Sequence, residues 1–159
     1  MSKSISAIAV FNSKKIKGTV RFTEDGDNTV TIDINISGLK KNGLHGFHVH
    51  ECGDMSDQCE SMCSHFNPFN KKHGGSDSKE RHVGDLGNLK TDQYGIANYR
   101  TKDSIIKLRG TKCNIIGRGL IIHEDEDDCG KGNFPDSLTT GHAGKRIACA
   151  VIGYAKNSE

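Results

Sequence analysis

The sequence predicts an all-β fold, an antiparallel sandwich or barrel of seven or eight short strands with two long loops. Apolar and polar residues alternate strictly from Thr29 to Ser37, as expected for a strand with one buried face. No stretch shows a convincing helical period. Nineteen glycines, two prolines and no tryptophan are typical of many turns between short strands. A chain of 159 residues has room for one core, so we expect a single domain over residues 1–159.

The strands follow one another along the chain. Residues 4–10 and 16–23 are joined by a polar turn, and Val20 and Phe22 share one face of the second strand. The third strand, 29–37, follows an Asp-Gly-Asp-Asn turn that suits a hairpin. The remaining expected strands cover residues 44–50, 84–91, 96–101, 115–123 and 147–155.

Two long segments between these strands have no period of two. They cover residues 51–83 and 124–145. Loops of this length in a compact domain are usually functional or disordered. The first contains histidines, cysteines and the pair Gly74-Gly75, which favours two functional loops that close over a site on the wall of the fold.

Charge and hydropathy exclude two classes of partner. The formal net charge is +2, with acidic and basic residues interspersed, so we expect no nucleic-acid binding. No apolar run approaches the roughly 20 residues of a membrane span, and residues 1–10 lack the apolar core of a signal peptide. We therefore expect a soluble cytoplasmic protein.

Histidines give the strongest chemical signal. In the run from Gly43 to Glu51, His48 and His50 are two residues apart on a strand, so both point to one face and can converge on one metal ion. A strand that is rich in histidine by chance is the alternative. Four of the other six histidines count against it, because they fall where a second ion and a shared ligand would need them: His65, His73, His82 and His123.

The donor types suggest which metals bind. One loop carries three imidazoles and a carboxylate, the closed tetrahedral set that zinc takes in structural sites: His65, His73, His82 and Asp85. Copper accepts four nitrogens in a flattened arrangement with an open position. His48, His50 and His123 would supply three of them from the wall of the fold. His65 would supply the fourth, because its two ring nitrogens can bind one ion each.

Six cysteines are many for a cytosolic chain. Their spacing does not say which of them pair. No Cys-x-x-Cys occurs, which argues against a zinc ribbon or a thioredoxin motif. A thiolate zinc site built from Cys52, Cys59, Cys63 and His65 is an alternative.

Several runs together resemble the copper/zinc superoxide dismutase family. The resemblance is strong from Leu39 to Ala155 and weaker before it. It implies an eight-stranded antiparallel Greek-key barrel of the immunoglobulin-like sandwich type. The runs are Gly43-Leu-His-Gly-Phe-His-Val-His-Glu51, His65-Phe-Asn-Pro68, His73-Gly-Gly75, Arg81-His-Val-Gly-Asp-Leu-Gly-Asn88, Ile115-Ile-Gly-Arg118 and Gly141-His-Ala-Gly-Lys-Arg-Ile-Ala-Cys149.

The resemblance also implies a reaction and its residues. Two superoxide anions and two protons would give oxygen and hydrogen peroxide, at one copper and one zinc ion per subunit. His65 would bridge the metals and carry a proton, and Arg146 would pair with the substrate anion. Asp127 would accept hydrogen bonds from His48 and His73. Cys59 and Cys149 would form a disulfide, and the protein would be a homodimer with a copper chaperone as a further partner.

This chain departs from the family pattern at several positions. Thr139 replaces a common lysine, and Pro135 lies where acidic residues are usual, although Lys145 can compensate. We expect a rate that still falls with ionic strength. Cys52 stands where the family usually has a large apolar residue at its dimer contact, and Tyr154 replaces an aliphatic residue near the C-terminus. His142 stands in place of asparagine, and we assign it no metal role.

Two other functions fit the same resemblance. A copper-delivering chaperone would lack part of the copper set and carry a further metal-binding module, but all four histidines are present here and we find no such module. A non-catalytic metal-binding protein of the same fold is the second rival. Arg146 argues against it, and turnover would exclude it.

Overall fold

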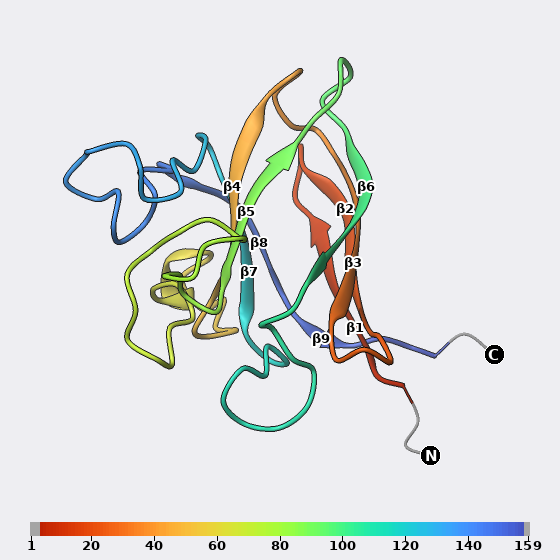
Figure 1. The fold of residues 1–159 in the computed structure, drawn as a ribbon. Helices are drawn as coiled ribbons and strands as arrows, with labels where there is room; N and C mark the ends of the chain where they lie inside the picture. Colours follow the sequence, from red (N-terminus) through yellow and green to blue (C-terminus); the bar gives the residue numbers. More distant parts are fainter. Residues whose placement is uncertain (1–3, 158–159) are drawn as a thin grey trace.

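The computed structural model describes residues 4–157 and shows two antiparallel sheets that face each other (Figure 1). The first sheet has the spatial order β6 (Ala97–Asp103), β3 (Val30–Ser37), β2 (Lys17–Glu24), β1 (Ser6–Asn12) and β9 (Gly153–Tyr154). The second has the order β5 (Asp85–Lys90), β4 (Leu44–His50), β7 (Gly119–His123) and β8 (Arg146–Val151). The predicted all-β fold is confirmed. Residues 1–3 and 158–159 of the predicted domain lie outside the described residues.

The chain crosses repeatedly between the two sheets. It passes from β3 to β4, from β5 back to β6 and from β6 to β7, so β3 pairs with β6 and β4 pairs with β7. These pairings of strands that are distant in sequence give the Greek-key arrangement. As a result, β4 and β7 lie side by side and bring residues 48–50 next to residue 123.

The hydrophobic core lies between the sheets. The alternation predicted in β3 is observed, since Ile32, Ile34 and Ile36 are at most 3% exposed while Asn35 is exposed. Every residue of β7 is buried. One face of β7 packs in the core and the other lies beneath the long loops, so both faces of this strand exclude water.

Two of the predicted strands are shorter than expected. Residues 115–118 form a turn, closed by a hydrogen bond from Arg118 N–H to Ile115 O at 3.1 Å, and Gly117 adopts a φ of 81° that suits glycine. The last strand leaves the second sheet at Ile152 and joins the first as β9. Ile152 makes its backbone hydrogen bonds to Gly117 and Arg118, so the chain can change sheets without leaving a buried donor unpaired.

The two long loops cover the outer side of the second sheet (Figure 1). The first loop, residues 51–84, contains the 3₁₀ helix η1 (Glu60–Met62), which the sequence pattern does not predict. A disulfide between Cys59 and Cys149 ties this loop to β8, as the family resemblance implies. Within residues 4–157, no helix has the length and apolar character needed to cross a membrane.

Candidate metal centre

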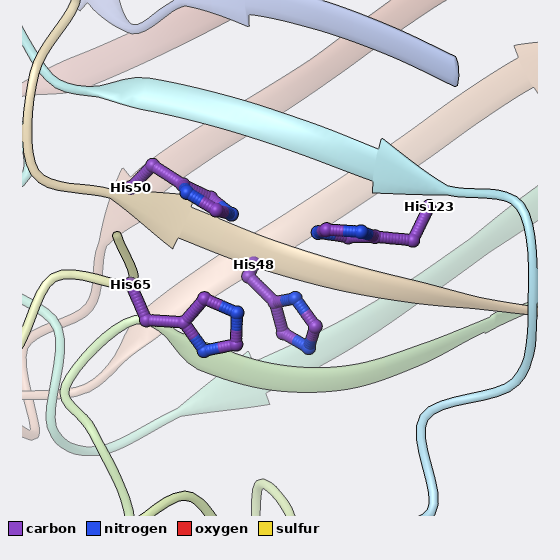
Figure 2. Close-up of side chains that lie close together, drawn as sticks. All are labelled: His48, His50, His65 and His123. Atoms are coloured by element: carbon purple, nitrogen blue, oxygen red, sulfur yellow. The ribbon is translucent and has the colours of Figure 1, made fainter. Parts of the chain in front are cut away.

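Two strands and one loop bring four imidazoles together, as Figure 2 shows. His48 and His50 lie on β4, and His123 ends β7 beside them. His65 comes from the first loop, where it forms an isolated antiparallel bridge with His50. All four residues are at most 5% exposed, and one ring nitrogen from each lies within 4.8 Å of the others. We call this group the four-histidine cluster.

Each ring of this cluster has one buried nitrogen without a hydrogen-bond partner among the described residues. In the three histidines on strands, the other ring nitrogen donates a hydrogen bond to an oxygen outside the cluster. His48 Nε2–H donates to Asp127 Oδ2 at 2.6 Å, His50 Nδ1–H to Cys63 O at 2.8 Å, and His123 Nδ1–H to Gly144 O at 3.1 Å. Such bonds fix the tautomer and the ring orientation of a metal ligand. The unpartnered atoms are His48 Nδ1, His50 Nε2, His65 Nε2 and His123 Nε2.

Burial keeps these rings neutral. It lowers the pKa of His48 and His50 well below the usual value, and the neighbouring His65 lowers both further. Burial also lowers the pKa of His65, and it lowers that of His123 to about 4. A neutral imidazole offers a lone pair, which is the form that binds metals. The four inward nitrogens are therefore suited to hold a cation.

A second group of donors surrounds one carboxylate. Asp85 Oδ1 lies 2.9 Å from His65 Nδ1, 3.0 Å from His73 Nδ1 and 3.2 Å from His82 Nδ1. Asp85 is fully buried; desolvation would raise its pKa, but hydrogen bonds from the three histidines hold the pKa far below the usual value. We call this group, which consists of His65, His73, His82 and Asp85, the Asp85 cluster.

His48 Nδ1 also lies within 4.8 Å of the His65, His73 and Asp85 donor atoms. It is nevertheless a poor ligand for the Asp85 cluster, because its only free nitrogen already belongs to the four-histidine cluster. His82 Nδ1 has no such competing role and approaches His65 Nδ1 at 3.2 Å. The predicted set of three histidines and Asp85 differs from the group of mutually closest donor atoms in having His82 in place of His48, and it stays a prediction.

Asp127 connects the two groups. Its Oδ2 accepts from His48, and its Oδ1 accepts from His73 Nε2–H at 2.7 Å. Asp127 is 2% exposed. Burial alone would lower the pKa of His73, but the hydrogen bonds to Asp127 and Asp85 outweigh it and raise that pKa to about 9. The two carboxylates thus favour a positive charge at the position of His73.

His65 belongs to both groups. Its Nδ1 is 2.9 Å from Asp85 Oδ1, and its Nε2 is the unpartnered atom in the four-histidine cluster. The ring centroids of His65 and His48 are 4.1 Å apart. A single buried ring therefore presents one nitrogen to each of two adjacent cation sites.

The four-histidine cluster opens on a cleft of about 850 Å³. Its lining includes His50, His65 and His123 of the cluster, His82, the acidic Asp136 and four cationic side chains: Lys71, Lys72, Lys145 and Arg146. Backbone carbonyls hold Arg146: Nη1 donates to Cys59 O at 2.8 Å and to Glu60 O at 3.5 Å, and Nη2 donates to Cys63 O at 2.6 Å. A small anion in the cleft would meet these cations on its way to the histidines.

The structure adds residues to which the sequence alone assigned no role. Asn88 exchanges hydrogen bonds with the backbone of Asp127 at 3.0 and 2.7 Å and so fixes that carboxylate. The carbonyls of Cys63 and Gly144 orient His50 and His123. Asn88 lies in one of the runs that resemble the family, so the sequence indicated that it matters but not what it does. The role of a backbone carbonyl cannot be predicted from residue types, because every residue has one.

Geometry also decides the roles of three other residues. His45 is a satisfied structural residue, since its Nδ1–H donates to His123 O at 2.7 Å. His142 lies outside both clusters, 2.7 Å from Asp136 and stacked on Phe134. The thiolate zinc site considered as an alternative is wrong, because Cys59 is engaged in the disulfide with Cys149.

These observations define a β-sandwich metalloprotein with two adjacent cation sites that share one imidazole. The family model for copper/zinc superoxide dismutase (SODC) matches residues 16–152. A superoxide dismutase [Cu-Zn] of Paramecium bursaria Chlorella virus 1 is 60% identical over 158 residues, 99% of this chain and 83% of that protein. The one of Yarrowia lipolytica is 51% identical over 94% of this chain and 97% of its own.

A solved structure shows the same fold. The crystal structure of the clock protein EA4 superposes with a TM-score of 0.93 at 44% identity and covers 98% of both chains. Taken together with the family model, these similarities show that the chain belongs to the copper/zinc superoxide dismutase family. The unpartnered buried nitrogens and the Asp85 carboxylate fit the copper and zinc ions of this family.

Proposed function

We propose that this chain disproportionates superoxide at a copper ion and a zinc ion that share His65. The reaction converts two superoxide anions and two protons to oxygen and hydrogen peroxide. The observation that carries the proposal is the placement of His65, which has one nitrogen in each cluster. The four-histidine cluster is the proposed copper site, and the Asp85 cluster is the proposed zinc site.

The donor sets support this division. Four imidazole nitrogens without a carboxylate suit copper, whereas three imidazoles with one carboxylate suit zinc. Copper would supply a one-electron acceptor and donor, and zinc, which has no redox chemistry, would supply a fixed positive charge. His48, His50 and His123 reach their site from the rigid sheet, and Asp127 orients one ligand of each metal.

The remaining chemistry belongs to side chains that line the cleft. His65 Nε2 is the ring atom that can hold a proton and pass it to a reduced substrate. Arg146 cannot lose its own proton, so its guanidinium remains a donor to the superoxide anion at every working pH. The neighbouring Lys71, Lys72 and Lys145 would raise the local concentration of the anion.

The cellular setting completes the proposal. We propose a cytoplasmic homodimer that receives copper from a chaperone. Two exposed side chains with apolar surface support a dimer, since Val151 on β8 is 39% and Tyr154 on β9 is 66% exposed. Sedimentation of a Tyr154→Lys variant beside the unaltered protein tests it, because a charge in the contact should shift the equilibrium towards monomer.

Turnover tests the activity itself. Protein loaded with one copper and one zinc per chain should consume superoxide, and His123→Ala protein loaded in the same way should not. A non-catalytic metal-binding protein would bind both ions without turnover. That result would overturn the proposal and leave only a metal store of this fold.

A further inference from the structure

Cys63 has a backbone conformation that cysteine rarely adopts. Its φ of 65° and ψ of −151° lie in a region populated almost only by glycine. Such strain persists only where the surroundings hold it, and it is often linked to function. The Cys63 thiol is exposed. An exposed thiol therefore occupies a strained position next to Ser64, which lines the cleft.

The Cys63 carbonyl holds two functional side chains at once. It accepts a hydrogen bond from His50 Nδ1–H at 2.8 Å and one from Arg146 Nη2 at 2.6 Å. Any rotation of the backbone at residue 63 would move this oxygen. Both a proposed copper ligand and the proposed anion-binding arginine depend on its position.

Cys52 lies across from Cys63. His50 and His65 are paired in an antiparallel bridge, and Glu51 N–H donates to Ser64 O at 2.9 Å, so the next residues in that register are Cys52 and Cys63. Cys52 N–H donates to Met62 O at 3.1 Å, which shows that the pairing slips by one residue at Cys63. At such a slip two residues of one strand oppose one residue of the other, so Met62 and Cys63 both lie opposite Cys52. Neither Cys52 nor Cys63 is in the disulfide between Cys59 and Cys149, so both thiols are available to react.

We propose that Cys52 and Cys63 are a thiol pair that hydrogen peroxide oxidises to a second intrachain disulfide, and that this bond lowers activity by displacing the carbonyl that positions Arg146. The choice of oxidant rests on the proposed function, because hydrogen peroxide is the product released into the adjacent cleft. The effect on activity rests on the geometry of residue 63.

The chemistry balances with two thiols and one peroxide. The exposed Cys63 sulfur attacks one peroxide oxygen, the O–O bond breaks, and a sulfenic acid and one water form. The Cys52 sulfur then attacks the Cys63 sulfur, the S–S bond forms, and the sulfenic oxygen leaves as a second water. The thiols lose two electrons and two protons in total, and the peroxide takes up all of them.

The new bond would pull on a residue that is already strained. Cys63 is joined to η1 on one side and is two residues from His65 on the other. A link from its sulfur to Cys52 changes the torsions at residue 63 and therefore the direction of its carbonyl. Arg146 would keep its bonds to Cys59 O and Glu60 O but lose the shortest one, to Cys63 O. A loss of roughly tenfold in kcat/KM corresponds to one charge-assisted hydrogen bond.

Disulfide mapping tests the thiol chemistry directly. The metal-loaded protein is treated with a small excess of hydrogen peroxide, free thiols are blocked, and the chain is cut without reduction at acidic residues such as Asp54 and Glu60, which separate Cys52 from Cys63. We expect a Cys52–Cys63 cross-link that a mild thiol reverses, with Cys59–Cys149 intact. A Cys59–Cys63 bond, a bond between two chains, or unchanged thiols would overturn the proposal.

Activity tests the coupling to the cleft. Cys52→Ser removes the partner thiol without touching the cleft, so its basal kcat/KM should equal that of the unaltered protein and should resist peroxide. Cys113→Ser, a control thiol elsewhere in the chain, should be as sensitive as the unaltered protein. Equal losses in Cys52→Ser and unaltered protein, or a disulfide with unchanged kcat/KM, would contradict the coupling. The mapping reads thiols alone, so its result stands whether or not the protein consumes superoxide.

Discussion

The two clusters share His65 but are built from different parts of the fold. The four-histidine cluster takes three of its residues from β4 and β7, whose pairing in the second sheet fixes their spacing. The Asp85 cluster takes its three histidines from the first loop, and only Asp85 lies on a strand. We infer that the sheet preorganises the proposed copper site, whereas the proposed zinc site must also hold a long loop in place.

The two clusters also differ in charge. Burial keeps the four-histidine cluster neutral, and it faces a cleft lined by cations. The Asp85 cluster contains a buried carboxylate that favours a cation. A site of neutral donors beside a cationic cleft therefore adjoins a site whose carboxylate suits a structural ion. Variants that alter one cluster and spare the other should separate the two roles.

The largest effect should come from removing a ligand of one cluster only. His123→Ala should lower superoxide consumption by at least roughly 100-fold, more than the loss of an outer hydrogen-bond partner causes. Zinc content should remain one per chain, because His123 lies outside the Asp85 cluster. Metal analysis and stopped-flow kinetics measure both. Loss of zinc together with copper would show that the two sites do not form independently.

The disulfide should matter most for the loop that carries the Asp85 cluster. It closes a separation of 90 residues between the first loop and β8. Cys149→Ser should therefore lower the free energy of unfolding by roughly 2–5 kcal/mol. Chemical denaturation measures this, with Cys113→Ser as the control for loss of a sulfur. Equal changes in the two variants would mean that the bond does not restrain the loop.

Asp127→Asn should weaken both sites together. An amide offers one acceptor atom, so it cannot accept from both His48 and His73 as the carboxylate does. We expect roughly 10–100-fold lower affinity for each metal. Glu126→Gln, which changes an exposed residue of the same acidic run, is the matched control. If competition titrations show lower affinity for copper but unchanged affinity for zinc, Asp127 does not couple the two clusters.

The smallest effect should be that of salt on the rate. Lys71, Lys72, Lys145 and Arg146 line the cleft, and mobile ions screen charges beyond roughly 8 Å at physiological ionic strength. The rate constant for superoxide should fall several-fold from low to physiological salt. A double variant, Lys71→Gln with Lys72→Gln, should show a shallower slope. A rate independent of salt would mean that these residues do not guide the anion.

Local patterns in the sequence were sufficient for much of the fold, and they named the histidines that the structure brings together at the four-histidine cluster. Strict alternation located β3, and the spacing of His48 and His50 placed two imidazoles on one face. The end of the last strand was harder to predict, because the apolar residue Ile152 is buried at the change of sheet and so continues the apolar pattern. Its change of sheet depends on backbone hydrogen bonds to Arg118, which is distant in sequence. The turn at Gly117 was hidden by the apolar residues around it.

Backbone conformation is the second feature that the sequence did not predict. The strain at Cys63 and its opposition to Cys52 follow from a one-residue slip in pairing that no local pattern records. Cysteine spacing left the pairs undecided, and only the family resemblance indicated Cys59 with Cys149. The carbonyls that orient His50 and His123 belong to residues whose side chains play no part in the contact.

The central claim is that one imidazole serves two metals, and anomalous diffraction tests it most directly. Crystals of protein loaded with copper and zinc would be measured at the absorption edge of each metal. We predict one copper peak at His65 Nε2 and one zinc peak at His65 Nδ1, with Asp85 on the zinc side only. Two ions that do not share residue 65, or a copper ion beside Asp85, would contradict the account.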